Sequence, residues 1–181
     1  MLQMEQKDYR FEILKILSNS REHIRGIAKK LHINHMMIVR KMKELLKMNV
    51  VDFDKKGRNQ VYFIKDSPEA REFVLMTEHY KLVKLLGKYP FLRDFIEKIQ
   101  KDKKLRLVLI FGSYAKETAD KNSDVDIFIG TLDREIKEKY SNDSKFSVKI
   151  GKLGKDNLSK EIEKNHIILK GGEIYYDKIF N

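Results

Sequence analysis

The sequence has no cysteine, which excludes disulfide bonds and thiolate zinc sites. It also lacks any apolar run near the roughly 18 to 20 residues that a membrane-spanning helix needs. Residues 1–8 are polar and contain no signal-peptide core. Internal repeats, low-complexity tracts and Gly/Ser-rich linkers are missing too. Because 41% of the residues are hydrophobic, we expect a folded protein. The missing cysteines, membrane span and signal core together lead us to expect a cytoplasmic protein with no membrane partner.

The net charge of +11 is spread unevenly along the 181 residues. Residues 1–66 carry 15 Lys and Arg against 8 Asp and Glu, whereas residues 67–100 carry 6 against 5 and residues 101–181 carry 17 against 14. A basic segment can bind nucleic acid through its phosphates. Lysine-rich surfaces also occur in proteins with no such partner. Net charge bears on what a protein associates with and does not define its fold.

The first 66 residues predict three helices followed by a β-hairpin. Apolar residues recur at helical spacing in three segments, residues 9–17, 24–31 and 35–48. Asn34 is a suitable N-cap for the third helix. Two strands are expected at residues 50–53 and 60–64, joined by a polar turn. Over residues 9–65 this order resembles the winged helix-turn-helix regulators of bacteria and archaea, in which an Ala, here Ala28, lies where two helices touch.

That resemblance implies a DNA-binding module whose third helix enters the major groove of double-stranded DNA. Arg40 is the best candidate for a base contact, because Arg can pair with guanine through two hydrogen bonds. The predicted DNA-binding residues are His35, Met36, Arg40, Lys41, Lys43, Lys56 and Arg58. Alternatively, these charges only solvate a helix face, or the module binds protein. No carboxylate or thiol pattern joins the nearby histidines into a metal site.

Residues 67–100 predict a helical connector. Ser67 and Pro68 mark a helix start, and the helix should continue to about residue 86. Residues 87–90 end it, and a second helix is expected at 91–100. The expected domains are therefore residues 1–66, 67–100 and 101–181, with a homodimer formed through the connector helices.

Residues 101–181 predict a small α/β domain. Strands are expected at residues 104–111, 125–129, 146–150 and 167–169, and helices at 132–140 and 157–165. With the first module, this makes an α+β protein with a small mixed sheet in its C-terminal domain.

Four residues around the first two of these strands suggest chemistry. Asp124 and Asp126 are two apart at a strand start, so their carboxylates share one face and repel each other unless a cation lies between them. Mg²⁺ prefers such oxygen ligands and takes waters or substrate phosphates for the rest. Gly112 allows the backbone to approach a phosphate closely. The Ser113 hydroxyl and the N–H groups after it can bind phosphate oxygens, and a helix starting there would add its dipole.

The combination of an apolar strand, Gly-Ser, a polar loop and Asp-x-Asp before a second apolar strand resembles the DNA polymerase beta superfamily. It is most similar to the minimal nucleotidyltransferases, over residues 100–170. The resemblance implies a nucleoside triphosphate such as ATP, bound with Mg²⁺ or Mn²⁺. It implies that Asp124 and Asp126 are metal ligands and catalytic residues. It also implies that Gly112, Ser113 and Lys116 bind the nucleotide.

One element of the family pattern is missing. The family carries a third carboxylate on a later strand, but the strand expected at residues 146–150 reads FSVKI and has no acid. Asp143 precedes this strand and could serve only if the strand began earlier. Lys149, if it pointed inward, would place a positive charge in the site instead. The third acid helps to hold the catalytic metal and to activate the nucleophile, so we expect metal–nucleotide binding with slow or absent turnover.

Three functions fit these features. The first is an enzyme that transfers a nucleoside monophosphate to a hydroxyl acceptor and releases pyrophosphate. The second is a transcriptional regulator with a catalytically degenerate nucleotidyltransferase domain that senses nucleotide or binds a partner. The third is a component of a toxin–antitoxin pair, with a partner protein, because small nucleotidyltransferases are frequently paired in this way. The sequence names neither the acceptor nor the DNA site.

Overall fold

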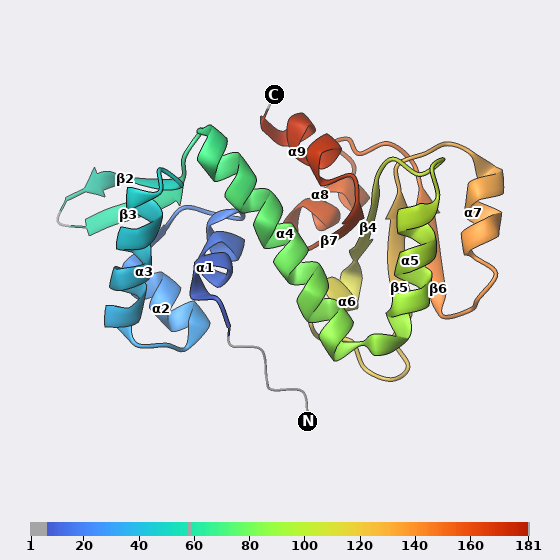
Figure 1. Cartoon of the computed structure of the whole chain (residues 1–181), viewed down its shortest axis with the longest axis horizontal. Helices are drawn as coiled ribbons and strands as arrows, with labels where there is room; N and C mark the ends of the chain where they lie inside the picture. The colour runs from blue at the N-terminus through green and yellow to red at the C-terminus, as the bar shows by residue number, and fades with distance from the viewer. Residues whose placement is uncertain (1–6, 58, 181) are drawn as a thin grey trace. The chain divides into compact units, whose positions relative to one another are not determined.

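The computed structural model describes residues 7–57 and 59–180, with no side chain described at 56 or 178–180 (Figure 1). The chain divides into two compact units, and the boundary falls between Tyr80 and Lys81, inside one long helix. Both units combine helices with a small sheet, which confirms the predicted α+β class. No helix in the part of the chain just given has both the length and the apolar composition needed to cross a bilayer.

In its described residues the first unit contains three helices, the beginning of a fourth and a three-stranded antiparallel sheet of order β1-β3-β2. Its elements in chain order are α1 (Tyr9–Leu17), β1 (Glu22–His23), α2 (Ile24–Leu31), α3 (His35–Lys47), β2 (Val51–Lys56), β3 (Asn59–Ile64) and the first part of α4 (Pro68–Lys88). Figure 1 shows β2 and β3 extending from the helices as a hairpin. This is the element order of a winged helix-turn-helix.

Local sequence explains most of these boundaries. The Asn34 side chain accepts a hydrogen bond from the Met36 amide at 2.7 Å and caps α3, as predicted. Ser67 caps α4 through the Ala70 amide at 3.1 Å. The hairpin strands are longer than predicted, because the charged Lys55 is paired in register with Gln60 instead of lying in the turn. The two-residue strand β1 was not predicted and is too short to leave a pattern.

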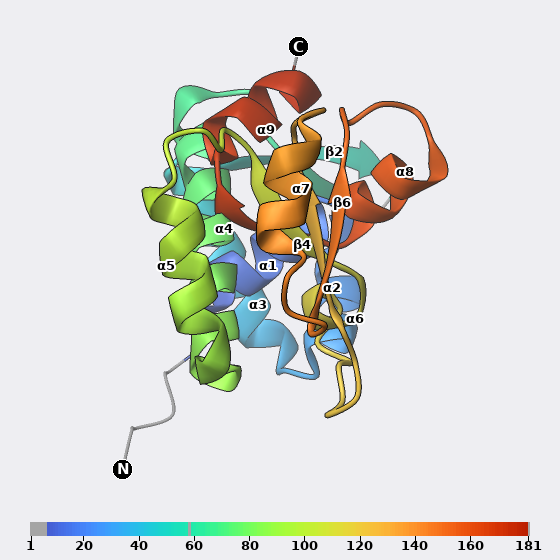
Figure 2. The same ribbon diagram turned by 90° about the vertical axis from the view of Figure 1, so that its right-hand side faces the viewer.

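The second unit is built on a four-stranded mixed sheet of order β6-β5-β4-β7. Strand β4 is antiparallel to both β5 and β7, whereas β5 and β6 are parallel. After α4 the elements are η1 (Pro90–Leu92), α5 (Arg93–Lys101), β4 (Val108–Phe111), α6 (Gly112–Ala115), β5 (Val125–Ile129), α7 (Arg134–Tyr140), β6 (Phe146–Ile150), α8 (Asn157–Lys164), β7 (Ile167–Lys170) and α9 (Gly172–Phe180). Figure 2 views this unit with α5 and α7 near the reader.

Each unit has its own hydrophobic core. In the first, residues from all three helices and the hairpin are buried together, including Ile13, Ile38 and Leu45. In the second, Ile96 of α5 and Ile136 of α7 share a core with alternate residues of the sheet. Each such aliphatic side chain contributes roughly 1.5–3 kcal/mol when fully buried.

The structure differs from the sequence predictions at three places in the second unit. The strand expected at 104–111 is regular only from Val108, because Asp102 accepts hydrogen bonds from the amides of Lys104 and Leu105 in a turn. The helix α9 was not predicted. The segment after Phe111 forms α6, a helix of only four residues, too short for a substantial dipole.

Candidate functional site

Strand pairing brings Gly112 against Asp126. Phe111, the last residue of β4, is in register with Asp126 on the antiparallel β5, so the next residue lies beside that carboxylate. Gly112 has φ +68°, in the left-handed region that favours glycine. A Cβ at this position would overlap Oδ2 of Asp126 and lie 3.1 Å from its Cγ. The turn therefore requires glycine for both its backbone conformation and its contact with the acid.

Asp124 immediately precedes β5, and Asp126 is the second residue of this strand, on the face away from Val125 and Ile127. Val125 and Ile127 are buried, whereas Asp126 between them is half-buried and Asp124 is exposed. Burial raises the pKa of the Asp126 carboxyl, and the negative charges of Glu161 and Asp124 raise it further. A hydrogen bond from Ser147 and the positive charge of Lys149 act in the opposite direction. The carboxylate thus lies where a cation would stabilise its charged form.

The position next to Asp126 on β6 is occupied by Ser147. The parallel register pairs Asp126 with Ser147, so the two side chains share a face, and the Ser147 hydroxyl acts to lower the pKa of the Asp126 carboxyl. Lys149 lies on the same face but is exposed. Asp143 precedes the strand, is exposed, and accepts a hydrogen bond from the Lys145 amide at 2.8 Å. The described β6 therefore supplies a hydroxyl where the family pattern has a third acid.

An acid that the sequence reading missed lies on α8. Glu161 Oε1 accepts from Lys116 Nζ at 2.8 Å, and the Glu161 charge raises the pKa of Asp126. Glu161 therefore lies beside the Asp126 carboxylate and is paired with Lys116, the residue predicted to contact the nucleotide phosphates. Ile162 and Ser159 of α8 are buried, which orients the helix and leaves Glu161 half-exposed. Nothing in the local sequence distinguishes Glu161 from other helix-surface acids.

Ser113 lies in the turn between Gly112 and the polar loop and is half-buried. Its carbonyl oxygen accepts the Thr118 amide at 3.0 Å, which closes the loop behind the short helix. Tyr114 is buried, and its hydroxyl donates to the Ser123 carbonyl at 3.4 Å. These contacts tie the Gly-Ser turn to the segment that leads into Asp124.

The donor set at this site fits a metal bound together with phosphate. Within residues 7–57 and 59–180, no three or more His, Cys, Asp or Glu side chains form a group that could hold a metal by themselves. Asp124 and Asp126 would supply two carboxylates, and Gly112 brings the backbone of the turn directly against the second of them. Mg²⁺ binds through one or two carboxylates, waters and substrate phosphates, so this set agrees with its chemistry.

A mixed sheet with a glycine-serine turn beside an Asp-x-Asp strand defines a nucleotidyltransferase-type domain. Residues 94–178 match the model of the family described as Polymerase beta, Nucleotidyltransferase. The second unit therefore carries a nucleotidyltransferase domain, a class that takes a nucleotide and a divalent cation. No curated protein matches the chain.

Several solved structures are similar to parts of the chain. One is a homodimeric winged helix-turn-helix DNA-binding domain from Mycobacterium bovis, a possible ArsR-family regulator, with 24% identity over 39% of this chain and TM-score 0.36. This chain covers 65% of that domain, less than two thirds. The adhesin competence repressor of Streptococcus pyogenes shares 22% identity, with coverage of 52% of this chain and 80% of that one and TM-score 0.35. A toxin–antitoxin structure with AMP-PNP shares 25%, with coverage of 56% and 82% and TM-score 0.33.

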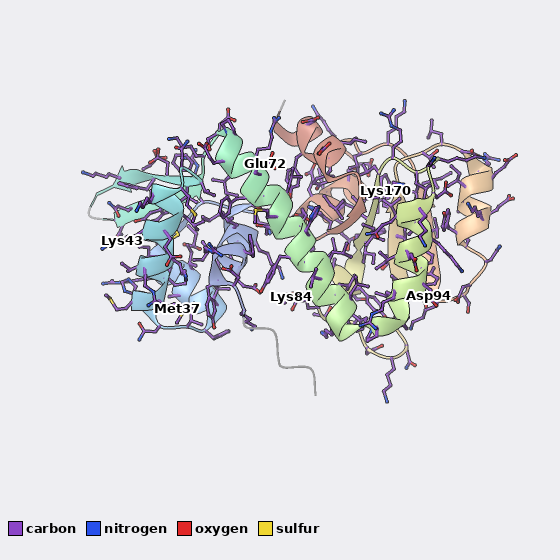
Figure 3. The ribbon with its side chains drawn as sticks, viewed as in Figure 1. Met37, Lys43, Glu72, Lys84, Asp94 and Lys170 are labelled. Carbon is purple, nitrogen blue, oxygen red and sulfur yellow. The ribbon has the colours of Figure 1, made fainter. Side chains whose placement is uncertain are left out.

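The residues predicted to contact DNA lie mainly on α3. His35, Met36, Arg40 and Lys43 are exposed on its outer surface, and Figure 3 labels Lys43. Lys41 is half-buried and donates to Glu44 at 2.8 Å, so its charge is already paired.

The other two predicted contacts belong to the hairpin. The Lys56 side chain and Arg58 lie outside the described residues.

A basic concavity joins α3 to the hairpin within the first unit. A cavity of about 410 Å³ is lined by His23 of β1, by Arg25 and His35 of the helices, and by Lys55 and Gln60 of the hairpin. The sequence reading had not selected Arg25 or Lys55. Their placement extends the basic surface from the third helix to the hairpin.

Proposed function

We propose that the chain is a DNA-binding protein whose nucleotidyltransferase domain binds a nucleoside triphosphate such as ATP with Mg²⁺ or Mn²⁺ and transfers a nucleoside monophosphate to a hydroxyl acceptor. The observation that carries this proposal is the contact between Gly112 and Asp126. A turn that places bare backbone directly against a half-buried carboxylate supports a site for a phosphate and a cation together.

Each site residue has a role in this proposal. Asp124 and Asp126 hold the metal, which neutralises phosphate charge when it is bound. Gly112 and Ser113 contact the triphosphate through backbone N–H groups and the hydroxyl. Lys116 is held beside the turn by Glu161 and interacts with the phosphates.

The test is transfer of label from an α-labelled nucleotide, in the presence of Mg²⁺ or Mn²⁺, to candidate hydroxyl acceptors. We expect label transfer that requires the metal and is lost in Asp124→Asn. Lys155→Ala, which changes an exposed residue with no role in the proposal, is the matched control. A folded protein that binds metal–nucleotide but labels no acceptor would remove the transferase activity from the proposal.

A second candidate function is a nucleotide-sensing regulator without transfer, and Ser147 favours it. This residue is in register with Asp126, where an acid would be expected to assist the nucleophile. In this case nucleotide would change DNA affinity, and DNA would change nucleotide affinity by the same factor, because linkage is reciprocal. Ser147→Asp distinguishes the two functions: a gain of label transfer would identify a degenerate transferase site.

The first unit supplies DNA binding in both candidate functions. The supporting observations are the exposed Arg40 and Lys43 on α3 and the basic concavity toward the hairpin. We also propose a homodimer through α4, because Met76 and Val83 are each about half-exposed and lie seven residues apart on this helix. Sedimentation analysis of Met76→Glu tests the dimer. A toxin–antitoxin partnership stays a prediction, which co-purification with the products of neighbouring genes would test.

A further inference from the structure

A groove in the second unit lies outside the candidate nucleotide site. It has a volume of about 1090 Å³ and is formed by α5, the end of α7 and the start of β6. We call it the aromatic–lysine groove and define it by three phenylalanines and three lysines, Phe91, Phe95, Phe146, Lys98, Lys103 and Lys145. Asp94, labelled in Figure 3, lies in its wall on α5. Because side chains alternate along β6, Phe146 faces away from the side that carries Ser147.

Flat aromatic rings form part of the groove. Phe95 and Phe146 stack with their centroids 3.9 Å apart and their planes 15° apart. Phe91 is 51% exposed. An exposed ring beside a stacked pair gives a planar apolar surface on which another ring can stack.

The charge in the groove is positive after its internal ion pairs are counted. Five lysines and three aspartates line it. Asp102 accepts hydrogen bonds from Lys139 at 2.6 Å and from the Tyr140 hydroxyl at 2.8 Å. The Asp102–Lys139 ion pair therefore adds no net charge to the groove. Lys98 and Lys103 are exposed, and neither forms an ion pair with any residue in 7–57 or 59–180. These two ammonium groups can therefore bind an anionic ligand.

Three contacts connect the groove to the candidate nucleotide site. Lys145 Nζ donates to the Ser123 carbonyl at 2.7 Å, immediately before Asp124. Phe91 contacts Tyr114 of the Gly-Ser turn, with ring centroids 6.3 Å apart. Phe146 is in register with Val125, the residue between the two aspartates. A ligand in the groove thus lies at the same end of the sheet as the aspartates.

We propose that the aromatic–lysine groove binds single-stranded nucleic acid, with bases stacking on Phe91 and Phe95 and backbone phosphates meeting Lys98 and Lys103. Stacking rings interleaved with lysines are what a single strand requires, because every base has a flat face and every nucleotide a phosphate. An acidic peptide would match the lysines but would make no use of the rings. The site goes beyond the proposed metal–nucleotide function and does not depend on it.

The test is fluorescence anisotropy of the full chain with a labelled single-stranded oligonucleotide of about 10 nucleotides, as DNA and as RNA. The background is Arg40→Ala/Lys43→Ala, which weakens binding by α3. We expect Phe91→Leu, which keeps apolar bulk and removes the ring, to weaken binding roughly tenfold. Lys98→Ala/Lys103→Ala should lower the slope of log affinity against log salt by about 1.4, because each phosphate contact on a single strand contributes about 0.7.

The matched control is Lys164→Ala, an exposed lysine on α8 that does not line the groove. It should bind the single strand with the affinity of the parent protein. Equal affinity of the groove variants and this control would overturn the proposal. Competition by poly-glutamate as effective as that of unlabelled oligonucleotide would also overturn it and would assign the groove to an acidic protein partner. A difference between the DNA and RNA arms identifies the preferred strand.

Discussion

Gly112→Ala is the perturbation that tests the geometry of the site most strongly. A non-glycine residue in the left-handed region costs about 1–2 kcal/mol. The added methyl also overlaps the Asp126 carboxylate, and forcing extra volume into a packed contact costs roughly 1–3 kcal/mol. Because Asp126 is only half-buried, its side chain can shift, so we expect a total loss of about 2–3 kcal/mol. For a chain of this size that corresponds to roughly 4–12 °C in melting temperature.

The control for Gly112→Ala is Gly57→Ala. Gly57 has φ +62°, but a Cβ there has no atom within 4 Å, so it reports the backbone cost alone. We expect it to cost about 1–2 kcal/mol in urea unfolding. In an Asp126→Ala background, Gly112→Ala should cost no more than this, because the overlap is gone.

The functional readout of Gly112→Ala is nucleotide affinity measured by calorimetry with Mg²⁺. We expect at least a roughly tenfold loss, equivalent to about 1.4 kcal/mol, because the displaced carboxylate no longer lies beside the turn. The reasoning is refuted if Gly112→Ala costs the same as Gly57→Ala and binds nucleotide like the parent protein.

Three further predictions concern charged residues of the candidate site and of the first unit. Asp126→Asn should stabilise the metal-free second unit at pH 7, since burial raises the Asp126 pKa. In thermal melts the gain should shrink as the pH falls through that pKa and be absent below about 3.9, where the carboxyl is neutral in both the folded and the unfolded state. Glu22→Gln should destabilise the first unit by about 0.5 kcal/mol at pH 7, because Lys30, at 2.6 Å, lowers the Glu22 pKa to about 2. That contribution to stability is present above about pH 4.3 and lost as the pH falls through about 2. Equal unfolding free energies of Glu22→Gln and the parent protein in urea near pH 7 would contradict it. Arg40→Ala/Lys43→Ala should weaken duplex DNA binding at least tenfold and lower its salt slope by about 1 or more, whereas unchanged duplex affinity would remove α3 from the interface.

Sequence patterns were sufficient where a segment determines its own structure. The helix Tyr9–Leu17 and the strands Val125–Ile129 and Phe146–Ile150 have the predicted bounds, because apolar spacing and flanking polar residues define them locally. The Asn34 cap is a local hydrogen bond and was predicted for the same reason.

The tertiary features of the site could not be predicted in this way. The pair Lys116–Glu161 joins residues 45 apart in the chain, and no periodicity encodes it. The pairing of Ser147 with Asp126 depends on the parallel register of β5 and β6, which the sequence leaves open. The sequence predicted that Gly112 lets the backbone approach a phosphate. The contact of Gly112 with Asp126 follows instead from the β4–β5 register. The aromatic–lysine groove likewise requires α5 and β6 to come together in the folded unit.

The most direct measurement of the central claim is calorimetric titration of Mg²⁺–ATP into the parent protein and into Asp124→Asn. The site geometry predicts saturable binding to the parent protein that requires the metal. It also predicts at least a tenfold weaker affinity in the variant, because one of the two carboxylates can no longer be charged. Equal affinities, or binding that is indifferent to Mg²⁺, would contradict a metal–nucleotide site at Gly112, Ser113, Asp124 and Asp126.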